Sequence, residues 1–96
     1  MYKDLDPLLH SQLRLSIVST LITVDEANFN FIKETTKATS GNISIQIKKL
    51  QEAGYIKVEK SFKNNYPNTT LSITDKGVEA FETYVNNLKK YINPGK

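Results

Sequence analysis

The 96-residue sequence contains no cysteine and a single histidine, and each scarcity removes a class of function. Without cysteine there can be no disulfide framework, thiolate zinc site or thiol nucleophile. His10 has no neighbouring cluster of carboxylates, so the sequence indicates neither a metal site nor an acid–base pair around it. We therefore predict a structural or surface role for His10, with no metal and no cofactor.

Long apolar runs are also missing. No stretch approaches the roughly 20 apolar residues that a membrane span requires, and the first residues lack the basic and then apolar order of a signal peptide. We expect a cytoplasmic protein without membrane contact. A glycine-rich phosphate loop, a nucleophile with its base and paired catalytic carboxylates are not recognisable either, so the prediction is not an enzyme. Without repeats or linkers, residues 1–96 are expected to form one domain with its core over about 8–92.

Positive charge is concentrated in the middle third of the chain. The formal net charge is +3, but residues 33–63 carry seven lysines against three glutamates, a net +4. A concentrated basic surface is typical of a face that binds phosphates. The alternative is an ordinary solvated surface rich in lysine.

The apolar spacing predicts a helix at each end of the chain and a short one between them. Residues 8–22 repeat apolar side chains at four-residue steps, after an Asp6-Pro7 start, and residues 28–35 form the shorter helix. Thr74 can cap a last helix, which we expect to end at Pro94. One side of that helix carries Val78, Phe81, Val85, Leu88 and Ile92.

The central segment has the clearest signals. Thr39 or Ser40 can cap a helix that is anchored by apolar residues at i, i+4 and i+7 and stopped by Gly54. Residues 55–60 and 69–73 then alternate as strands do, around a polar loop at 63–68. The fold class is mainly α with a small β-hairpin (α+β), in the order α-α-α-β-β-α.

Two short helices joined by a tight turn are typical of a helix-turn-helix. In the second of them, Ile43, Ile47 and Leu50 are the expected anchor. On the opposite face we expect Asn42, Gln46 and Lys49 to meet base edges or phosphates, since asparagine and glutamine can pair with adenine and lysine with guanine or phosphate. An ordinary amphipathic helix with a solvated face is the alternative.

A resemblance strengthens the first interpretation. Residues 44–60 read SIQIKKLQEAGYIKVEK, and together with 40–44 and 67–77 they resemble winged helix-turn-helix regulators related to the MarR and ArsR families. The nearer likeness is to minimal single-domain winged helix DNA-binding relatives, over roughly residues 8–92. In such relatives arginines usually precede the wing proline, whereas this chain has Asn65-Tyr66-Pro67-Asn68. Backbone contact by the wing, rather than arginine insertion into the minor groove, is therefore expected.

The resemblance implies a homodimer on double-stranded DNA with a palindromic operator. The recognition helix, at about 40–53, would enter the major groove, and the wing, at about 61–69, would lie on the backbone. The expected DNA-binding residues are Thr39, Ser40, Asn42, Ser44, Ile45, Gln46, Lys48, Lys49, Lys60, Lys63, Asn64 and Asn65. The surplus apolar surface of the terminal helices suggests a dimer interface of Leu9, Leu13, Phe81, Tyr84, Val85, Leu88, Tyr91 and Ile92.

The competing function is a winged-helix module for protein–protein contact, because fold alone does not fix function. The carboxylate-free start of the third helix favours DNA, since acidic groups there would repel phosphate. The sequence identifies no effector molecule. With one domain, an effector would have to bind at the dimer interface or be absent altogether.

Overall fold

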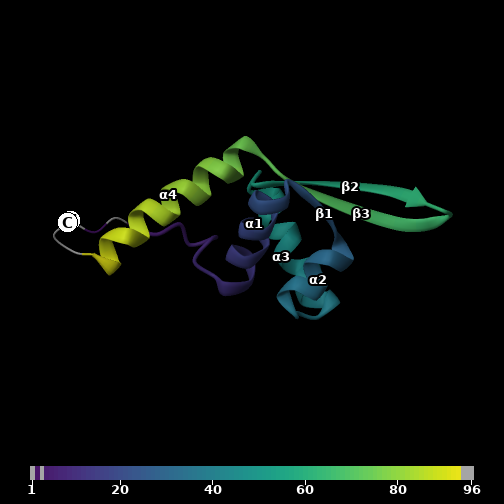
Figure 1. The fold of residues 1–96 in the computed structure, drawn as a ribbon, viewed down its shortest axis with the longest axis horizontal. Helices are drawn as coiled ribbons and strands as arrows, with labels where there is room; N and C mark the ends of the chain where they lie inside the picture. The colour runs from purple at the N-terminus through teal and green to yellow at the C-terminus, as the bar shows by residue number, and fades with distance from the viewer. Residues whose placement is uncertain (1, 3, 94–96) are drawn as a thin grey trace.

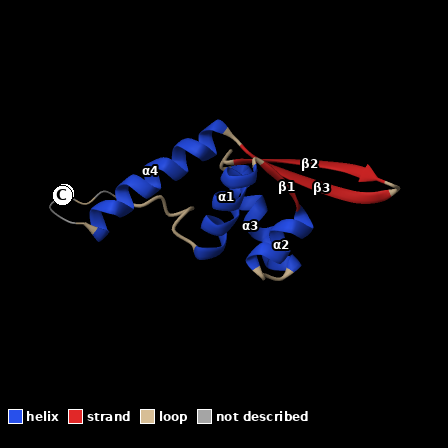
Figure 2. Cartoon of the chain, viewed as in Figure 1, coloured by secondary structure: helices blue, strands red, loops and turns tan. Residues whose placement is uncertain are grey.

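The computed structural model describes residues 2 and 4–93, and the elements follow the order α1-β1-α2-α3-β2-β3-α4 (Figure 1). The helices are α1 (Gln12–Val24), α2 (Phe29–Thr36), α3 (Ser40–Glu52) and α4 (Asp75–Ile92), and the strands are β1 (Glu26–Asn28), β2 (Ile56–Lys63) and β3 (Tyr66–Ile73). The first three helices form a bundle, from which α4 and the β2-β3 hairpin extend in opposite directions (Figure 2). The principal extents are therefore unequal, at 56 × 25 × 21 Å. The predicted α+β winged helix fold is confirmed, with one additional strand.

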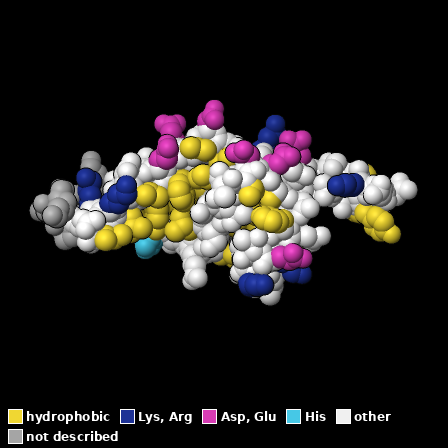
Figure 3. Space-filling view, in the orientation of Figure 1, with side chains coloured by type: hydrophobic (Ala, Val, Ile, Leu, Met, Phe, Trp, Pro, Cys, Tyr) yellow, Lys and Arg dark blue, Asp and Glu magenta, His cyan; other side chains and the backbone are white. Residues whose placement is uncertain are grey.

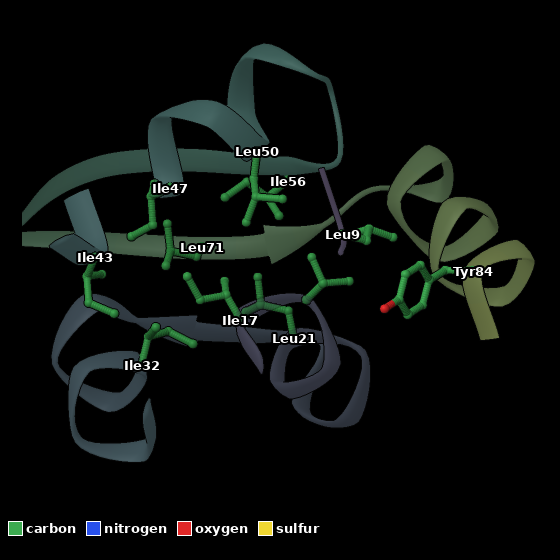
Figure 4. Packing of buried hydrophobic residues seen from close by; sticks show 11 residues of the cluster. Leu9, Ile17, Leu21, Ile32, Ile43, Ile47, Leu50, Ile56, Leu71 and Tyr84 are labelled. Carbon is green, nitrogen blue, oxygen red and sulfur yellow. The ribbon is translucent and has the colours of Figure 1, made fainter. Parts of the chain in front are cut away.

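The core lies where the three bundle helices meet the inner ends of β2 and β3 (Figure 4). The three residues predicted to anchor the third helix are all buried there. They pack with fully or almost fully buried apolar side chains from the other elements, namely Ile17, Val18, Leu21, Ile32, Ile56 and Leu71. The periodicity of α3 was thus sufficient to identify its inner face.

The first helix begins later than its apolar spacing predicted, at Gln12 instead of residue 8. Ser11 has an extended backbone (φ −150°, ψ 125°), which separates α1 from a turn over residues 7–10. Asp6 holds that turn: its carbonyl oxygen accepts from the amides of Leu9 and His10, and its Oδ1 accepts from the amide of Leu8 at 2.9 Å. The Asp6-Pro7 pair therefore starts a separate turn, and the apolar residues at 8 and 9 are not helical.

The strand β1 was not predicted. It pairs antiparallel with β3, placing Ala27 opposite Leu71, so the sheet order is β1-β3-β2. Asn28 ends this strand and caps α2, because its side-chain oxygen accepts from the amide of Phe31 at 2.8 Å. Three residues are too few to display an alternating pattern, and pairing with β3 defines the strand.

The wing is longer and its turn tighter than expected. Instead of a loop over 63–68, β2 runs to Lys63 and β3 begins at Tyr66. Only Asn64 and Asn65 connect them, with φ of 53° and 67°. Two successive left-handed residues form the turn whose twist matches a hairpin, and asparagine tolerates that conformation. The asparagines that suggested a loop by composition are turn residues.

The last helix begins as predicted. The hydroxyl of Thr74 accepts from the amide of Gly77 at 3.0 Å and donates to the carbonyl oxygen of Gly54 at 2.6 Å. Gly77 passes so close to the Tyr55 carbonyl that a Cβ at this position would overlap it. The end expected at Pro94 lies outside the described residues.

Candidate nucleic-acid interface

The helix α3 is fixed at both ends by local structure. At its start the hydroxyl of Thr39 accepts from the amide of Asn42 at 3.2 Å, and no acidic residue occupies the first turn. At its end Gly54 adopts φ 81°, a conformation in which glycine is favoured. The N-terminus of α3, with Thr39 and Ser40, is exposed and can receive an anion.

The exposed face of α3 differs from the one predicted. At about 100° per residue, the positions farthest from the apolar anchor are Gly41, Ile45, Lys48 and, in the last turn, the exposed Glu52. Ile45 is 55% exposed. Gln46 lies instead beside the anchor and is half-buried, so the expectation that Asn42, Gln46 and Lys49 lie opposite the anchor is wrong for Gln46. Asn42 and Lys49 lie on the same side of α3 as Gln46 but farther from the core, and both are exposed.

Gln46 is half-buried because it is part of a hydrogen-bonded chain. The Arg14 guanidinium on α1 donates from Nε to the carbonyl oxygen of Leu8 at 2.6 Å and from an Nη to Oε1 of Gln46 at 2.5 Å. Nε2 of Gln46 in turn donates to Oδ1 of Asn42 at 2.9 Å. Sequence reasoning did not select Arg14, since no local pattern links positions 32 residues apart.

A groove of about 320 Å³ separates the outer flank of α3 from the wing. Ser44, Lys48 and Gln51 line it from the helix. Val58, Lys60 and Thr69 line it from the hairpin. Two cations on facing walls of a groove can bind a polyanion such as a nucleic-acid backbone between them.

The register of the wing decides which lysines face that groove. Lys60 lies opposite Thr69 and shares a face of the hairpin with Val58, whereas Lys57 and Lys63 occupy the other face. Nζ of Lys57 lies 3.8 Å from a carboxylate oxygen of Glu59, in a highly exposed pair. Of the predicted wing lysines, the structure therefore places Lys60 beside α3 and Lys63 near the tip, on the opposite face.

The tip of the wing exposes aromatic side chains that the sequence analysis missed. Phe62 is 78% exposed and Tyr66 is 74% exposed, and Asn64 and Asn65 form the exposed turn between the strands. Figure 3 shows an apolar group at this end, separate from the apolar band over α4. Phe62 opposes Pro67 across the hairpin, a pairing that follows from the two-residue turn.

The residues predicted for a dimer interface divide into two sets. Leu9 and Tyr84 are buried within the single chain, and Nδ1 of His10 lies 3.0 Å from the Tyr84 hydroxyl. Tyr91 stacks on Tyr2 with ring centroids 4.7 Å apart, so this stripe of α4 contacts the chain's own N-terminal segment. The neighbouring stripe consists of half-buried or exposed apolar side chains, namely Val78, Phe81, Val85, Leu88 and Ile92. Leu13 on α1 is half-buried.

No group of three or more His, Cys, Asp or Glu side chains in residues 2 and 4–93 is arranged to hold a metal ion. Within the same residues, every helix is too short or too polar to span a bilayer.

Comparison with known proteins agrees with this geometry. Residues 13–92 match the family model described as "Winged helix DNA-binding domain". The chain belongs to this winged helix family. A relative in Methanocaldococcus jannaschii, an uncharacterised protein, is 34% identical over 76 residues, which is 79% of this chain and 83% of the relative. The family match extends from the second residue of α1 to the end of α4 and so includes both walls of the groove.

Several solved structures that are similar to this winged helix chain are those of transcriptional regulators. The transcriptional regulator homologue of Pyrococcus horikoshii is similar with a TM-score of 0.82 and 30% identity, over 88% of this chain and 84% of that one. A MarR variant from E. coli in complex with operator DNA is similar with a TM-score of 0.71 and 13% identity, over 90% of this chain and 61% of MarR. At that identity the likeness to MarR shows the fold alone. The MarR-like winged helix predicted from the sequence is confirmed.

Proposed function

We propose that this protein is a sequence-specific transcription regulator that binds double-stranded DNA as a homodimer. The observation that carries the proposal is the groove between α3 and the wing, with Lys48 on one wall and Lys60 on the other. Its lining residues, all of them in the described part of the chain, include no carboxylate. A DNA strand in this groove would leave α3 free to enter the major groove beside it.

The predicted contacts fall into three groups with different roles. Thr39 and Ser40, at the exposed start of α3, would hold a phosphate. Bases would be read from the exposed side of α3, with Ile45 against a thymine methyl group. Sequence-independent backbone contacts would come from the groove and the wing, namely from Ser44, Lys48, Lys60, Lys63, Asn64 and Asn65, and from Lys49 on the other flank of α3.

A homodimer would use the outward stripe of α4, which is Val78, Phe81, Val85, Leu88 and Ile92. Phe81 and Leu88 also pack partly against the core of the same chain. Ile92 is 67% exposed, and Phe81, Val85 and Leu88 continue the same side of the helix toward its start. Figure 3 shows the apolar band over α4 that this stripe helps to form. A two-fold pairing of such stripes would bury apolar surface and present two recognition helices to two half-sites.

The wing tip favours a second candidate function, which is protein docking. Exposed aromatic residues are enriched in protein interfaces, and Phe62 and Tyr66 are both largely exposed. Under this alternative the tip would bind a partner protein, and α3 would not select a DNA sequence.

Selection of bound fragments from random duplex DNA by the purified protein separates the two functions. We expect enrichment of a palindrome whose half-site centres lie about 34 Å, or a multiple of it, apart. Recovery of unenriched DNA at all salt concentrations would contradict sequence-specific regulation and favour the docking function.

A further inference from the structure

The hydrogen-bonded chain of Arg14, Gln46 and Asn42 has a direction that the chemistry of its members determines. A guanidinium carries only donors, so the Gln46 atom that faces Arg14 must be the oxygen, Oε1. The amino group of Gln46 then faces Asn42, and only Oδ1 of Asn42 can accept from it. Both side-chain amides are thereby oriented by Arg14, which is itself held by the Leu8 carbonyl.

The consequence appears at Asn42, the exposed end of the hydrogen-bonded chain. Oδ1 of Asn42 is turned toward Gln46, and Nδ2 takes part in no hydrogen bond among the described residues. Asn42 is exposed in the first turn of α3, and its backbone is held by the Thr39 cap. Its side chain therefore presents two N–H donors to whatever binds α3.

We propose that Arg14 is a specificity-positioning residue that makes Asn42 a reader of guanine. An outward amino group matches the adjacent acceptors N7 and O6 on the major-groove edge of guanine. The two-bond pairing of asparagine with adenine requires its oxygen and its amino group to face the base together. This inference rests on the proposed function, since it assigns a base to one position of that interface.

The decisive variant is Gln46→Glu. It reverses the direction of the hydrogen bond between residues 46 and 42 and keeps the bond to Arg14. One oxygen of the introduced carboxylate still accepts from Arg14, but the other can only accept, so Asn42 must turn its amino group inward. Oδ1 of Asn42 then points outward and requires a donor, such as N4 of cytosine or N6 of adenine. In a selection from random duplex DNA, we expect one position per half-site to change from guanine to cytosine or adenine, by about tenfold.

Gln12→Glu is the matched control, because it makes the same change at an exposed residue outside both the hydrogen-bonded chain and the groove. Gln46→Glu should also weaken binding to all sequences through repulsion of phosphate. Only Gln46→Glu should change the base preference. Arg14→Leu should erase the preference at that position, because Gln46 can then turn either way.

A measurement on the free protein tests the positioning step without DNA. In the ¹⁵N spectrum of the side-chain amides, the Gln46 amino protons should be protected from exchange and those of Asn42 should exchange freely. In Gln46→Glu the Asn42 amino protons should become protected. An unchanged Asn42 signal in folded Gln46→Glu overturns the inference, whatever the DNA result.

The DNA results distinguish failure of this inference from failure of the proposed function. A wild-type protein that enriches a palindrome, together with Gln46→Glu that enriches the same bases, supports the proposed function and overturns the inference. If Asn42→Ala weakens all sequences equally, Asn42 meets a phosphate oxygen and not a base, and the inference is again overturned. Failure of the wild-type protein to select any sequence would overturn the proposed function and the assignment of guanine together.

Discussion

The hydroxyl of Tyr55 donates to Oδ2 of Asp6 at 2.5 Å, joining residues 49 positions apart in the sequence. Tyr55 lies three residues after the end of α3, and Asp6 holds the turn that precedes α1. Because Oδ1 of Asp6 accepts from Leu8 and the Leu8 carbonyl accepts from Arg14, this bond begins a path that continues to Asn42. The N-terminal segment is thus connected by hydrogen bonds to the first turns of α3.

Alkaline pH should weaken this link. Burial raises the pKa of Tyr55 from 10.0 to about 12, and the hydrogen bond to Asp6 and its negative charge act in the same direction. The folded state therefore binds the phenolic proton more tightly than the unfolded state. This contribution is fully present below pH 10 and is lost as the pH rises toward 12. Chemical unfolding of the wild type and of Tyr55→Phe should show a smaller loss between pH 10 and 12 in the variant. Parallel losses would contradict a role for Tyr55.

Gly77 and Gly41 should respond oppositely to alanine. A Cβ at Gly77 would overlap the Tyr55 carbonyl, a backbone atom that cannot move away alone, so Gly77→Ala should lower the free energy of unfolding by about 1–3 kcal/mol. Nothing lies within 4 Å of a Cβ at Gly41, which is helical, so Gly41→Ala should raise it by roughly 0.5–1 kcal/mol. Thermal unfolding measures both. A tolerated Gly77→Ala would contradict the close approach of Gly77 to the Tyr55 carbonyl.

The outward stripe of α4 can be tested at its most exposed member. Ile92→Asp should raise the dimer dissociation constant about tenfold or more, because a carboxylate would enter an apolar interface, while the fold of the single chain is preserved. Asn86→Asp adds the same charge to an exposed position outside the stripe and should leave association unchanged. Sedimentation at several concentrations is the measurement. A wild-type protein that is monomeric at tens of micromolar would exclude this dimer.

Two lysines on opposite faces of β2 test whether the wing binds DNA through the face that lines the groove. Lys60→Ala should weaken binding to every DNA sequence by a similar factor and lower the slope of log affinity against log salt by roughly 0.9 per lost phosphate contact, hence roughly 1.8 for a dimer. Lys57→Ala removes the same charge from the other face of the strand and should have a much smaller effect. Equal effects of the two substitutions would show that the protein responds to total charge and not to a groove.

The sequence was informative where a pattern was long or chemically explicit. The helices α3 and α4 each carry a threonine cap and a repeated apolar spacing, and both begin where those signals placed them. The strand β1 was missed because pairing with β3 defines its three residues. The turn at Asn64 and Asn65 was mistaken for a loop because composition does not report φ.

The candidate interface was predictable in outline only. The sequence located the helix and the wing, but Gln46 was assigned to the wrong side because position 46 lies next to both Ile43 and Leu50 on a helical wheel. Its contact with Arg14 depends on how α1 packs across α3, which no local pattern encodes. The facing of Lys60 toward α3 likewise depends on a strand register that the two-residue turn sets.

Thr74 joins the segment that follows α3 to the start of α4. Its hydroxyl binds the Gly54 carbonyl at the end of α3, its amide binds the Tyr55 carbonyl, and the same hydroxyl caps α4. At about 1.5 Å per residue, α4 is a lever arm of about 27 Å, so a tilt of about 5° at Thr74 displaces its far end by about 2 Å. In the proposed dimer, the angle between the two α4 helices would determine the distance between the two recognition helices. The angle of α4 at Thr74 would therefore affect which operator spacing the dimer fits.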